Sequence, residues 1–271
     1  MRKLLCALPL LFALIALSGC SDGKESAPTE AAQESGTGVA VNEDFVEGNL
    51  YFLAYHELGH ALVSELDLPV TGREEDAVDR IAIWMMTPES GDEQPDYLLD
   101  AMQGWFSFGD QTSLDEIAWW DEHGTDHQRG YQIACLLFGA DPERYRDLAT
   151  DVGLPPERQE SCVWESQQNQ AVWDRLLMPH IREENVASPT SAMAVSYDPT
   201  ERHRAESDYL RKIGLLEHVA SLMHDTYGLK SGIGVVAEEC GEANAFWDAE
   251  GRKLVICYEL VAEYKSIAST G

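Results

Sequence analysis

One helical pattern, over residues 50–63, is apolar on more than one face. The segment LYFLAYHELGHALV carries large apolar or small side chains at nearly every position, and its ionisable groups are few. A helix that is apolar all round lies inside a protein core. Pro69 and Gly72 then interrupt the pattern, because both residue types are unfavourable inside helices. We therefore expect a largely buried helix that ends before Pro69.

The rest of the chain up to residue 227 is also mostly helical in its pattern. Apolar residues recur every three or four positions in several segments, as amphipathic helices require. The expected helices cover residues 73–86, 95–108, 130–139, 165–177 and 205–227. The polar segment 183–203 contains Pro189 and Pro199, so we expect a connector or a surface loop there.

The pattern changes to that of strands after residue 231. Apolar and β-branched residues gather at 232–238, 244–247 and 253–258, and residues 248–251 form a turn between the last two segments. The expected fold class is therefore α+β, with a mainly helical part (43–227) and a small antiparallel sheet (232–258). Residues 43–271 number about 230, enough to bury one large core, so a single domain is expected.

The first 19 residues have the pattern of a targeting segment. Arg2 and Lys3 are basic, and the apolar run 4–17 that follows is too short for an ordinary transmembrane helix. The run ends in Leu-Ser-Gly-Cys20, which resembles a bacterial lipobox and predicts lipid attachment to Cys20. Ser21 stands where Asp would signal retention in the inner membrane, so we expect a lipid-anchored protein of the outer membrane, facing the periplasm or the exterior. A plain secretory signal is the alternative.

The segment 20–42 is rich in Ser, Gly, Ala, Glu and Thr, and it predicts a flexible linker between the lipid and the domain. Acidic residues outnumber basic ones by 48 to 19, which gives a formal net charge of −29. Such a surface repels nucleic acids and anionic lipid head groups. We therefore expect no nucleic-acid partner, and contact with a membrane only through the lipid. The substrate and the oligomeric state stay open.

Cysteine usage agrees with export. Two of the 6 cysteines lie in the targeting segment and at the lipidation site. The others are Cys135, Cys162, Cys240 and Cys257. An even number in an oxidising compartment indicates disulfides, for which three pairings are possible. The sequential pairing is the most economical, since each pair flanks a short local unit. A second metal site is the alternative, but no C-x-x-C spacing favours it.

The candidate chemistry lies in the buried helix, as the motif H-E-x-x-H at residues 56–60. Residues i and i+4 share one face of a helix, so His56 and His60 can direct two imidazole nitrogens at one metal ion. Imidazole suits Zn²⁺, and two histidines leave room for a third protein ligand and a water. Glu57 stands beside the first histidine, where it can accept a proton from that water. Two structural core histidines are the alternative, but a buried carboxylate between them would be costly.

The third ligand is expected from the following helix. Glu75 and Asp79 are also spaced i,i+4, so Glu75 can complete a His₂Glu site while Asp79 accepts a hydrogen bond from a ligand histidine. H-E-x-x-H followed by E-x-x-x-D resembles the gluzincin arrangement. Glu74, one residue out of register, is the competing ligand. An acidic helix start stabilised by the helix dipole is the structural alternative.

A polar cluster at residues 121–129 lies between apolar segments. Asp121, His123, Asp126 and Arg129 could support the metal ligands or polarise a scissile carbonyl. His123 is the preferred second catalytic group. A helix-capping loop held by ion pairs explains the same residues without a catalytic role.

Several blocks of the chain resemble a bacterial family of predicted zinc metallopeptidases. The resembling blocks are residues 52–62, 68–77, 120–123 with 128–129, 139–144, 240–246 and 257–260. The resemblance covers most of the expected domain. It implies a zincin-like fold and a single zinc ion held by His56, His60 and Glu75, with Glu57 as the general base.

The order of these blocks differs from that family. There, the Cys-Gly-Glu-Ala-Asn block precedes the H-E-x-x-H helix, whereas here it begins at Cys240, near the end of the sequence. A zincin needs a sheet beside its active helix, whose edge strand pairs with an extended substrate. Here residues 232–258 must supply that sheet. We therefore expect a circular permutation, which proteins tolerate when their termini lie close together.

The function predicted by these features is hydrolysis of peptide bonds by a zinc-dependent metallopeptidase acting on a peptide or protein substrate. Zinc would polarise the carbonyl, Glu57 would activate water, and His123 could steady the oxyanion. The alternative is a non-catalytic metal-binding lipoprotein that acts as a binding or structural module of the cell envelope. Glu57 argues against it, because structural zinc sites usually fill the fourth position with protein.

Overall fold

The computed structural model describes residues 41–88, 96–183 and 193–269. The predicted signal peptide, Cys20 and nearly all of the predicted linker lie outside these residues. The helices are α1 (Glu43–Leu66), α2 (Glu74–Met86), α3 (Tyr97–Gln111), α4 (Asp126–Ala140), α5 (Arg146–Asp151), α6 (Pro156–Leu177), α7 (Arg204–Ile213), α8 (Leu215–Ser221) and α9 (Tyr258–Ala268). Short segments η1 (Met178–His180) and η2 (Leu222–Thr226) follow α6 and α8. The strands are β1 (Ala194–Tyr197), β2 (Gly234–Glu238), β3 (Ala245–Asp248) and β4 (Lys253–Cys257).

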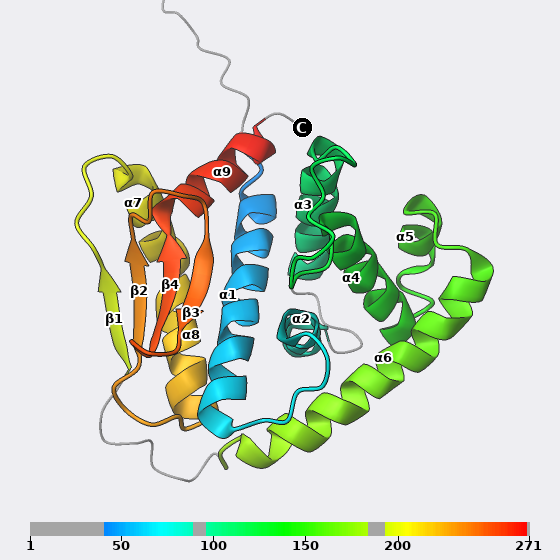
Figure 1. The fold of residues 1–271 in the computed structure, drawn as a ribbon, viewed down its shortest axis with the longest axis horizontal. Coiled ribbons are helices and arrows are strands. Elements are labelled where there is room, and N and C mark those ends of the chain that lie inside the picture. Colours follow the sequence, from blue (N-terminus) through cyan, green and yellow to red (C-terminus); the bar gives the residue numbers. More distant parts are fainter. Residues whose placement is uncertain (1–40, 89–95, 184–192, 270–271) are drawn as a thin grey trace, which may run out of the picture. The chain divides into compact units, whose positions relative to one another are not determined.

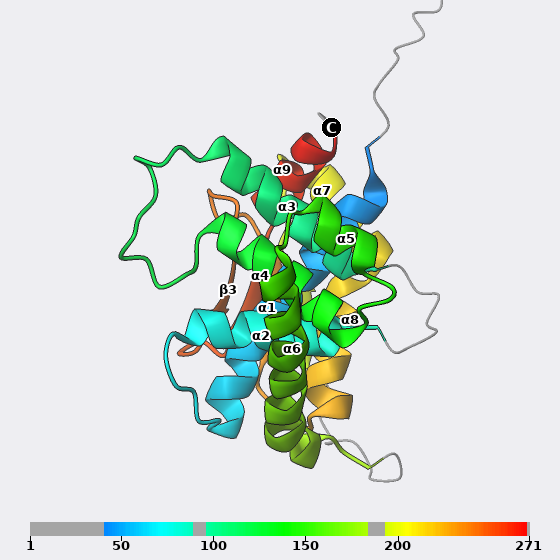
Figure 2. The same ribbon diagram turned by 90° about the vertical axis from the view of Figure 1, so that its right-hand side faces the viewer.

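Helix α1 is the central element and lies between the sheet and the helices α3, α4 and α6 (Figure 1), which face the viewer in Figure 2. On one side, Leu50 and Leu58 belong to an apolar core shared with the sheet and with α7, α8 and α9. Phe52 belongs to a second core, which α1 shares mainly with α3 and α4. The prediction of a largely buried helix is confirmed. Both sides of α1 are covered because both are apolar.

The sheet has the strand order β1-β2-β4-β3. Strands β1 and β2 pair in parallel, as do β2 and β4, whereas β3 and β4 are antiparallel. The α+β fold class with a small sheet is confirmed, but the sheet is mixed, so the expectation of an antiparallel sheet is wrong. The inner residues of β2 and β4 are buried apolar runs, as is usual for parallel strands that are covered on both faces. The turn between β3 and β4 indicated only the antiparallel pair.

Strand β1 lies within the segment that the sequence predicted as a connector or loop. Its side chains alternate between exposed and half-buried, so no continuous apolar run marks it. The sheet therefore extends beyond residues 232–258. Its pairing with β2, rather than its own composition, explains why Ala194–Tyr197 is a strand.

Two further differences concern helices near the sheet. The single helix expected over 205–227 is divided at Gly214, whose φ of 67° ends α7 in the left-handed conformation that glycine adopts easily. Helix α9, which follows β4 directly, was not predicted. The Phe45 and Tyr264 rings meet edge to face at 6.3 Å, so the beginning of α1 lies beside α9. Such closeness is what a permuted order requires, and the permutation itself stays a prediction.

Both disulfides of the sequential pairing are present. Cys135–Cys162 joins α4 to α6, and Cys240–Cys257 joins the segment before β3 to the end of β4. The preferred pairing is thus confirmed. Among the described helices, none combines the length and the apolar character that crossing a membrane would need.

Candidate metal centre

Helix α1 carries His56, Glu57 and His60 in its middle, where both of its sides are covered. His56 and Glu57 are buried, and the His60 side chain is 16% exposed. The two histidines lie one helical turn apart, and their ring centroids are separated by 5.0 Å. The i,i+4 spacing therefore places both imidazoles on the same side of the helix, as predicted.

A close approach of α2 to α1 brings the acidic residues of α2 to these histidines. A Cβ atom at Gly59 would lie only 2.9 Å from the Cβ of Val78, so the contact between the helices needs glycine at this position. Helix α2 begins at Glu74, directly after the turn at Gly72 and Arg73. Its first turn therefore faces the middle of α1.

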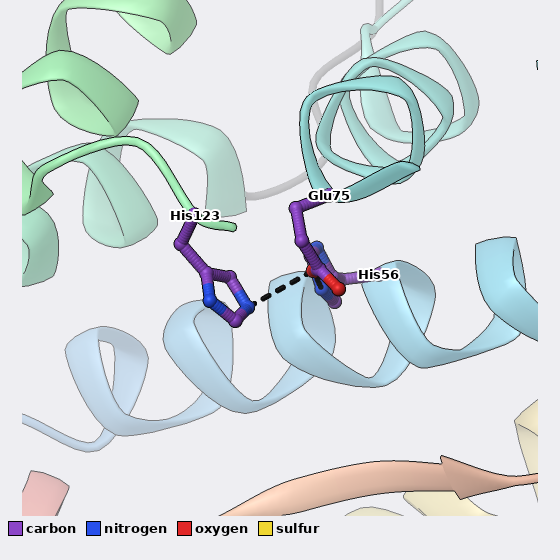
Figure 3. A group of neighbouring side chains, drawn as sticks. All are labelled: His56, Glu75 and His123. Atoms are coloured by element: carbon purple, nitrogen blue, oxygen red, sulfur yellow. Dashed lines mark hydrogen bonds and ion pairs between the residues drawn. The ribbon is translucent and has the colours of Figure 1, made fainter. Parts of the chain in front are cut away.

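One carboxylate oxygen of Glu75 is the point at which three imidazoles meet. Its Oε2 lies 3.1 Å from Nε2 of His56 and 3.3 Å from Nε2 of His60. Nε2 of His123 is at 2.9 Å from the same oxygen, and His123 comes from the loop before α4 (Figure 3). The ligand atoms of His56, Glu75 and His123 lie within 4.8 Å of one another, a grouping that could hold a metal ion.

The other nitrogen of each imidazole has a carboxylate partner of its own. Nδ1 of His56 is 2.7 Å from Asp79, and Nδ1 of His60 is 2.8 Å from Glu74. Nδ1 of His123 is 2.9 Å from Asp121. A carboxylate on Nδ1 fixes the ring and leaves Nε2 for a metal, which is the usual support for a ligand histidine.

Asp79 is itself held by a buried arginine. The Nε–H and Nη2–H groups of Arg129 donate to the two carboxylate oxygens of Asp79 at 2.8 and 2.6 Å. The guanidinium also lies 3.6 Å from the centroid of the Trp105 ring, in a cation–π arrangement. Because both charges are buried and doubly hydrogen-bonded, the Arg129–Asp79 pair fixes the position of His56.

The cluster shifts the ionisation of its members. Burial opposes the ionised form of Glu75, but hydrogen bonds from His123, His56 and His60 outweigh it and hold the pKa of this carboxyl well below its usual range. Burial likewise opposes the charged form of His60, whereas Glu75 and Glu74 raise its pKa to about 9. Glu75 and the imidazoles thus stabilise each other's charged forms.

Glu57 lies on the side of α1 that faces β3. Burial raises the pKa of its carboxyl, while the nearby His56 and His60 and a hydrogen bond from the backbone N–H of Trp247 oppose this rise. The hydrogen bond comes from β3, one of the two edge strands of the sheet. A raised pKa suits a group that takes up and returns a proton.

A cavity of about 360 Å³ opens beside His56 and Glu57. Its apolar wall includes Phe108 and Tyr264, and Asn244, just before β3, adds a polar group. The cavity thus joins the histidine cluster to the start of the edge strand. This is the arrangement that a site acting on an extended chain would need.

The sequence-proposed ligands His56 and His60 both reach Glu75, but the group of ligand atoms within 4.8 Å of one another consists of His56, Glu75 and His123 and leaves out His60. Glu75 faces the Nε2 atoms, whereas Glu74 binds the outer nitrogen of His60, as only one of two adjacent helix residues can point into the cluster. Asp79 occupies the outer position expected for it. His123 contacts Glu75 directly. Sequence reasoning missed the contact from Trp247, for which the chain gives no local signal.

The donor set at this site has the chemistry of a zinc site. Imidazole nitrogens and a carboxylate oxygen are the ligands that zinc prefers in His₂Glu sites. Because carboxylates occupy the three Nδ1 atoms, the Nε2 atoms are the ones that face Glu75 and could bind an ion there. The residues at this site therefore fit a zinc ion.

Comparison with known families agrees with this geometry. The profile of a family described as "putative metallopeptidase" matches residues 20–177 and 197–270. The matched segments include α1, α2, the loop that carries His123, and strands β2 to β4. Comparisons with curated proteins and with solved structures gave no match.

Proposed function

This chain belongs to the putative metallopeptidase family, and we propose that it is a zinc-dependent peptidase that hydrolyses peptide bonds. His56, His60 and Glu75 would hold the zinc ion. Support comes from one observation above all, the meeting of two i,i+4 histidines on one oxygen of Glu75 with the buried Glu57 beside them. A purely structural cluster would not need an acid at residue 57.

In the proposed hydrolysis, the bound ion and Glu57 have separate roles. A bound zinc ion would supply Lewis-acid chemistry, polarising the scissile carbonyl and acidifying a water molecule. Glu57 accepts the proton of the attacking water and returns it to the leaving amine. The raised pKa of Glu57 fits this double role.

Strand β3 and the cavity would bind the substrate. The N–H of Trp247 reaches Glu57, so β3 presents its unpaired edge to the site. An extended peptide can add to such an edge through main-chain hydrogen bonds. One substrate side chain would then enter the cavity lined by Phe108 and Tyr264.

The test is the variant Glu57→Gln in a peptide-library digest. It should still bind zinc but cleave about 10²- to 10⁴-fold more slowly, because the ligands stay and the proton acceptor is lost. Glu43→Gln on the same helix, where Glu43 is exposed and pairs with Lys212, serves as the control and should cleave like the parent. Cleavage by Glu57→Gln at the parent rate would contradict the proposal and favour the non-catalytic binding module.

We also propose that the chain is tethered to the outer membrane of the cell envelope by a lipid on Cys20. The basis is the Leu-Ser-Gly-Cys sequence after an apolar run, with Ser rather than Asp at position 21. Labelled fatty acid should enter the parent and not Cys20→Ala. Labelling that persists without Cys20 would rule the tether out.

A further inference from the structure

His123 approaches Glu75 more closely than either histidine of the H-E-x-x-H pair. Its Nε2 is 2.9 Å from Oε2, against 3.1 Å for His56 and 3.3 Å for His60. Figure 3 shows the His123 ring, carried by the loop before α4, pointing at Glu75. The cluster thus offers three imidazole nitrogens and one carboxylate, one imidazole more than a His₂Glu site needs.

Hydrogen bonds orient His123 from two directions. Asp121 accepts hydrogen bonds from both the backbone N–H and the Nδ1–H of His123, at 2.8 and 2.9 Å. Arg73 donates to the His123 carbonyl oxygen at 2.9 Å and also binds Asp76 on α2. The loop is therefore attached to the beginning of α2, and Nε2 is the nitrogen left to face the cluster.

We propose that His123 is a further metal ligand, the third imidazole beside His56 and His60, and that it takes the position which hydrolysis needs for water. The inference rests on the proposed function, since it concerns the same ion. Zinc with four protein ligands forms a closed site, whereas a catalytic site keeps one position open. Cleavage would then require Nε2 of His123 to give way to water. A role for His123 at the oxyanion alone would need no bond to the metal.

The test compares His123→Ala with His127→Ala in the purified protein. The two side chains are matched, because they are 43% and 45% exposed and each is bound to a carboxylate, His123 to Asp121 and His127 to Asp110. Zinc affinity is measured by competition with a chelator. The number of bound imidazoles is measured by X-ray absorption at the zinc edge.

His123→Ala should lower zinc affinity by at least the roughly 10- to 100-fold that loss of an outer partner costs, and should reduce the imidazole count from three to two. His127→Ala should change neither value. Asp121→Asn, which keeps the ligand but loosens it, should lower the affinity less. Equal affinity and equal imidazole counts in His123→Ala and His127→Ala would overturn the inference.

The two proposals fail in different ways. If the parent binds zinc through three imidazoles but cleaves no peptide, the ligand role of His123 stands and the peptidase function does not. If the parent cleaves peptides with zinc and His123→Ala binds zinc as tightly as His127→Ala, the peptidase function stands and the ligand role does not.

Discussion

His56 and His123 meet the same oxygen of Glu75 from two very different settings. His56 stands on the central helix, 3% exposed, and its Asp79 partner is buried under Arg129. His123 stands on a loop, 43% exposed, and its Asp121 partner is itself half-exposed. The hydrogen-bond lengths are nearly equal, 2.7 and 2.9 Å.

The two histidines have similar hydrogen-bond lengths, but breaking the interactions around them differs in free energy. A buried ion pair is strongly destabilising to break, because the remaining charge is left without a partner in a low-dielectric interior. An exposed pair contributes little, since water and salt can replace the partner. The helix side of the cluster, at His56, is therefore held rigidly. The loop side, at His123, is the side whose contacts can change.

The largest effect is expected at Arg129. Arg129→Met should lower the free energy of unfolding by about 3–5 kcal/mol, because the buried Asp79 carboxylate would lose its arginine partner and both hydrogen bonds from it, and only His56 would stay beside it. Arg73→Met, on the exposed side, should cost no more than about 1 kcal/mol. Denaturant unfolding at neutral pH measures both. Similar losses of unfolding free energy in Arg129→Met and Arg73→Met would contradict the contrast between the buried helix side and the exposed loop side of the cluster.

A smaller effect, on metal binding, is expected to separate the two adjacent glutamates of α2. Glu75→Ala should lower zinc affinity by more than about 100-fold, because it removes a ligand, whereas Glu74→Ala should cost about 10- to 100-fold as an outer partner of His60. Chelator competition gives both values. The reverse ranking would move the ligand to Glu74 and remove Glu75 from the site.

The smallest effect is a pH dependence that arises on the buried side. Burial opposes the ionised form of Asp79, but Arg129 and His56 lower its pKa to about 2. A lowered pKa contributes stability that is complete above the unfolded value of about 4 and is lost as the pH falls through 2, on the order of 2 kcal/mol in all. Asp79→Asn should therefore have a flatter stability profile between pH 4 and pH 2 than the parent. The exposed Asp110→Asn should follow the parent, and an unchanged slope in Asp79→Asn would contradict the assignment.

Local spacing was enough to predict the helix side of the cluster. His56 and His60 on one helix, and Glu75 and Asp79 on the next, are each related by i,i+4, so a single helical turn determines which side chains share a face. The polar residues around His123 stood out between apolar segments, which pointed to the cluster but not to the contact with Glu75. That contact depends on where the loop crosses α2.

The sequence could not predict features that depend on distant pairing. Strand β1 has no apolar run of its own and exists because β2 is beside it. Strands β2 and β4 pair in parallel, so they are not joined by a short turn that the sequence could have indicated. Trp247 reaches Glu57 through its backbone N–H. Every residue except proline carries this group, so the residue type at position 247 could not indicate the contact.

The position of α1 between two cores has a consequence for how the proposed metal site behaves without an ion. A helix covered on both sides cannot fray locally, so its amide hydrogens should exchange with solvent only when the whole molecule unfolds. The loop with His123 has no such protection. In hydrogen exchange, the amides around residues 56–60 should stay slow in the metal-free protein, and those around 119–124 should become fast. Helix α1 would then keep His56, Glu57 and His60 in position, so that an ion could bind without refolding of this part of the site.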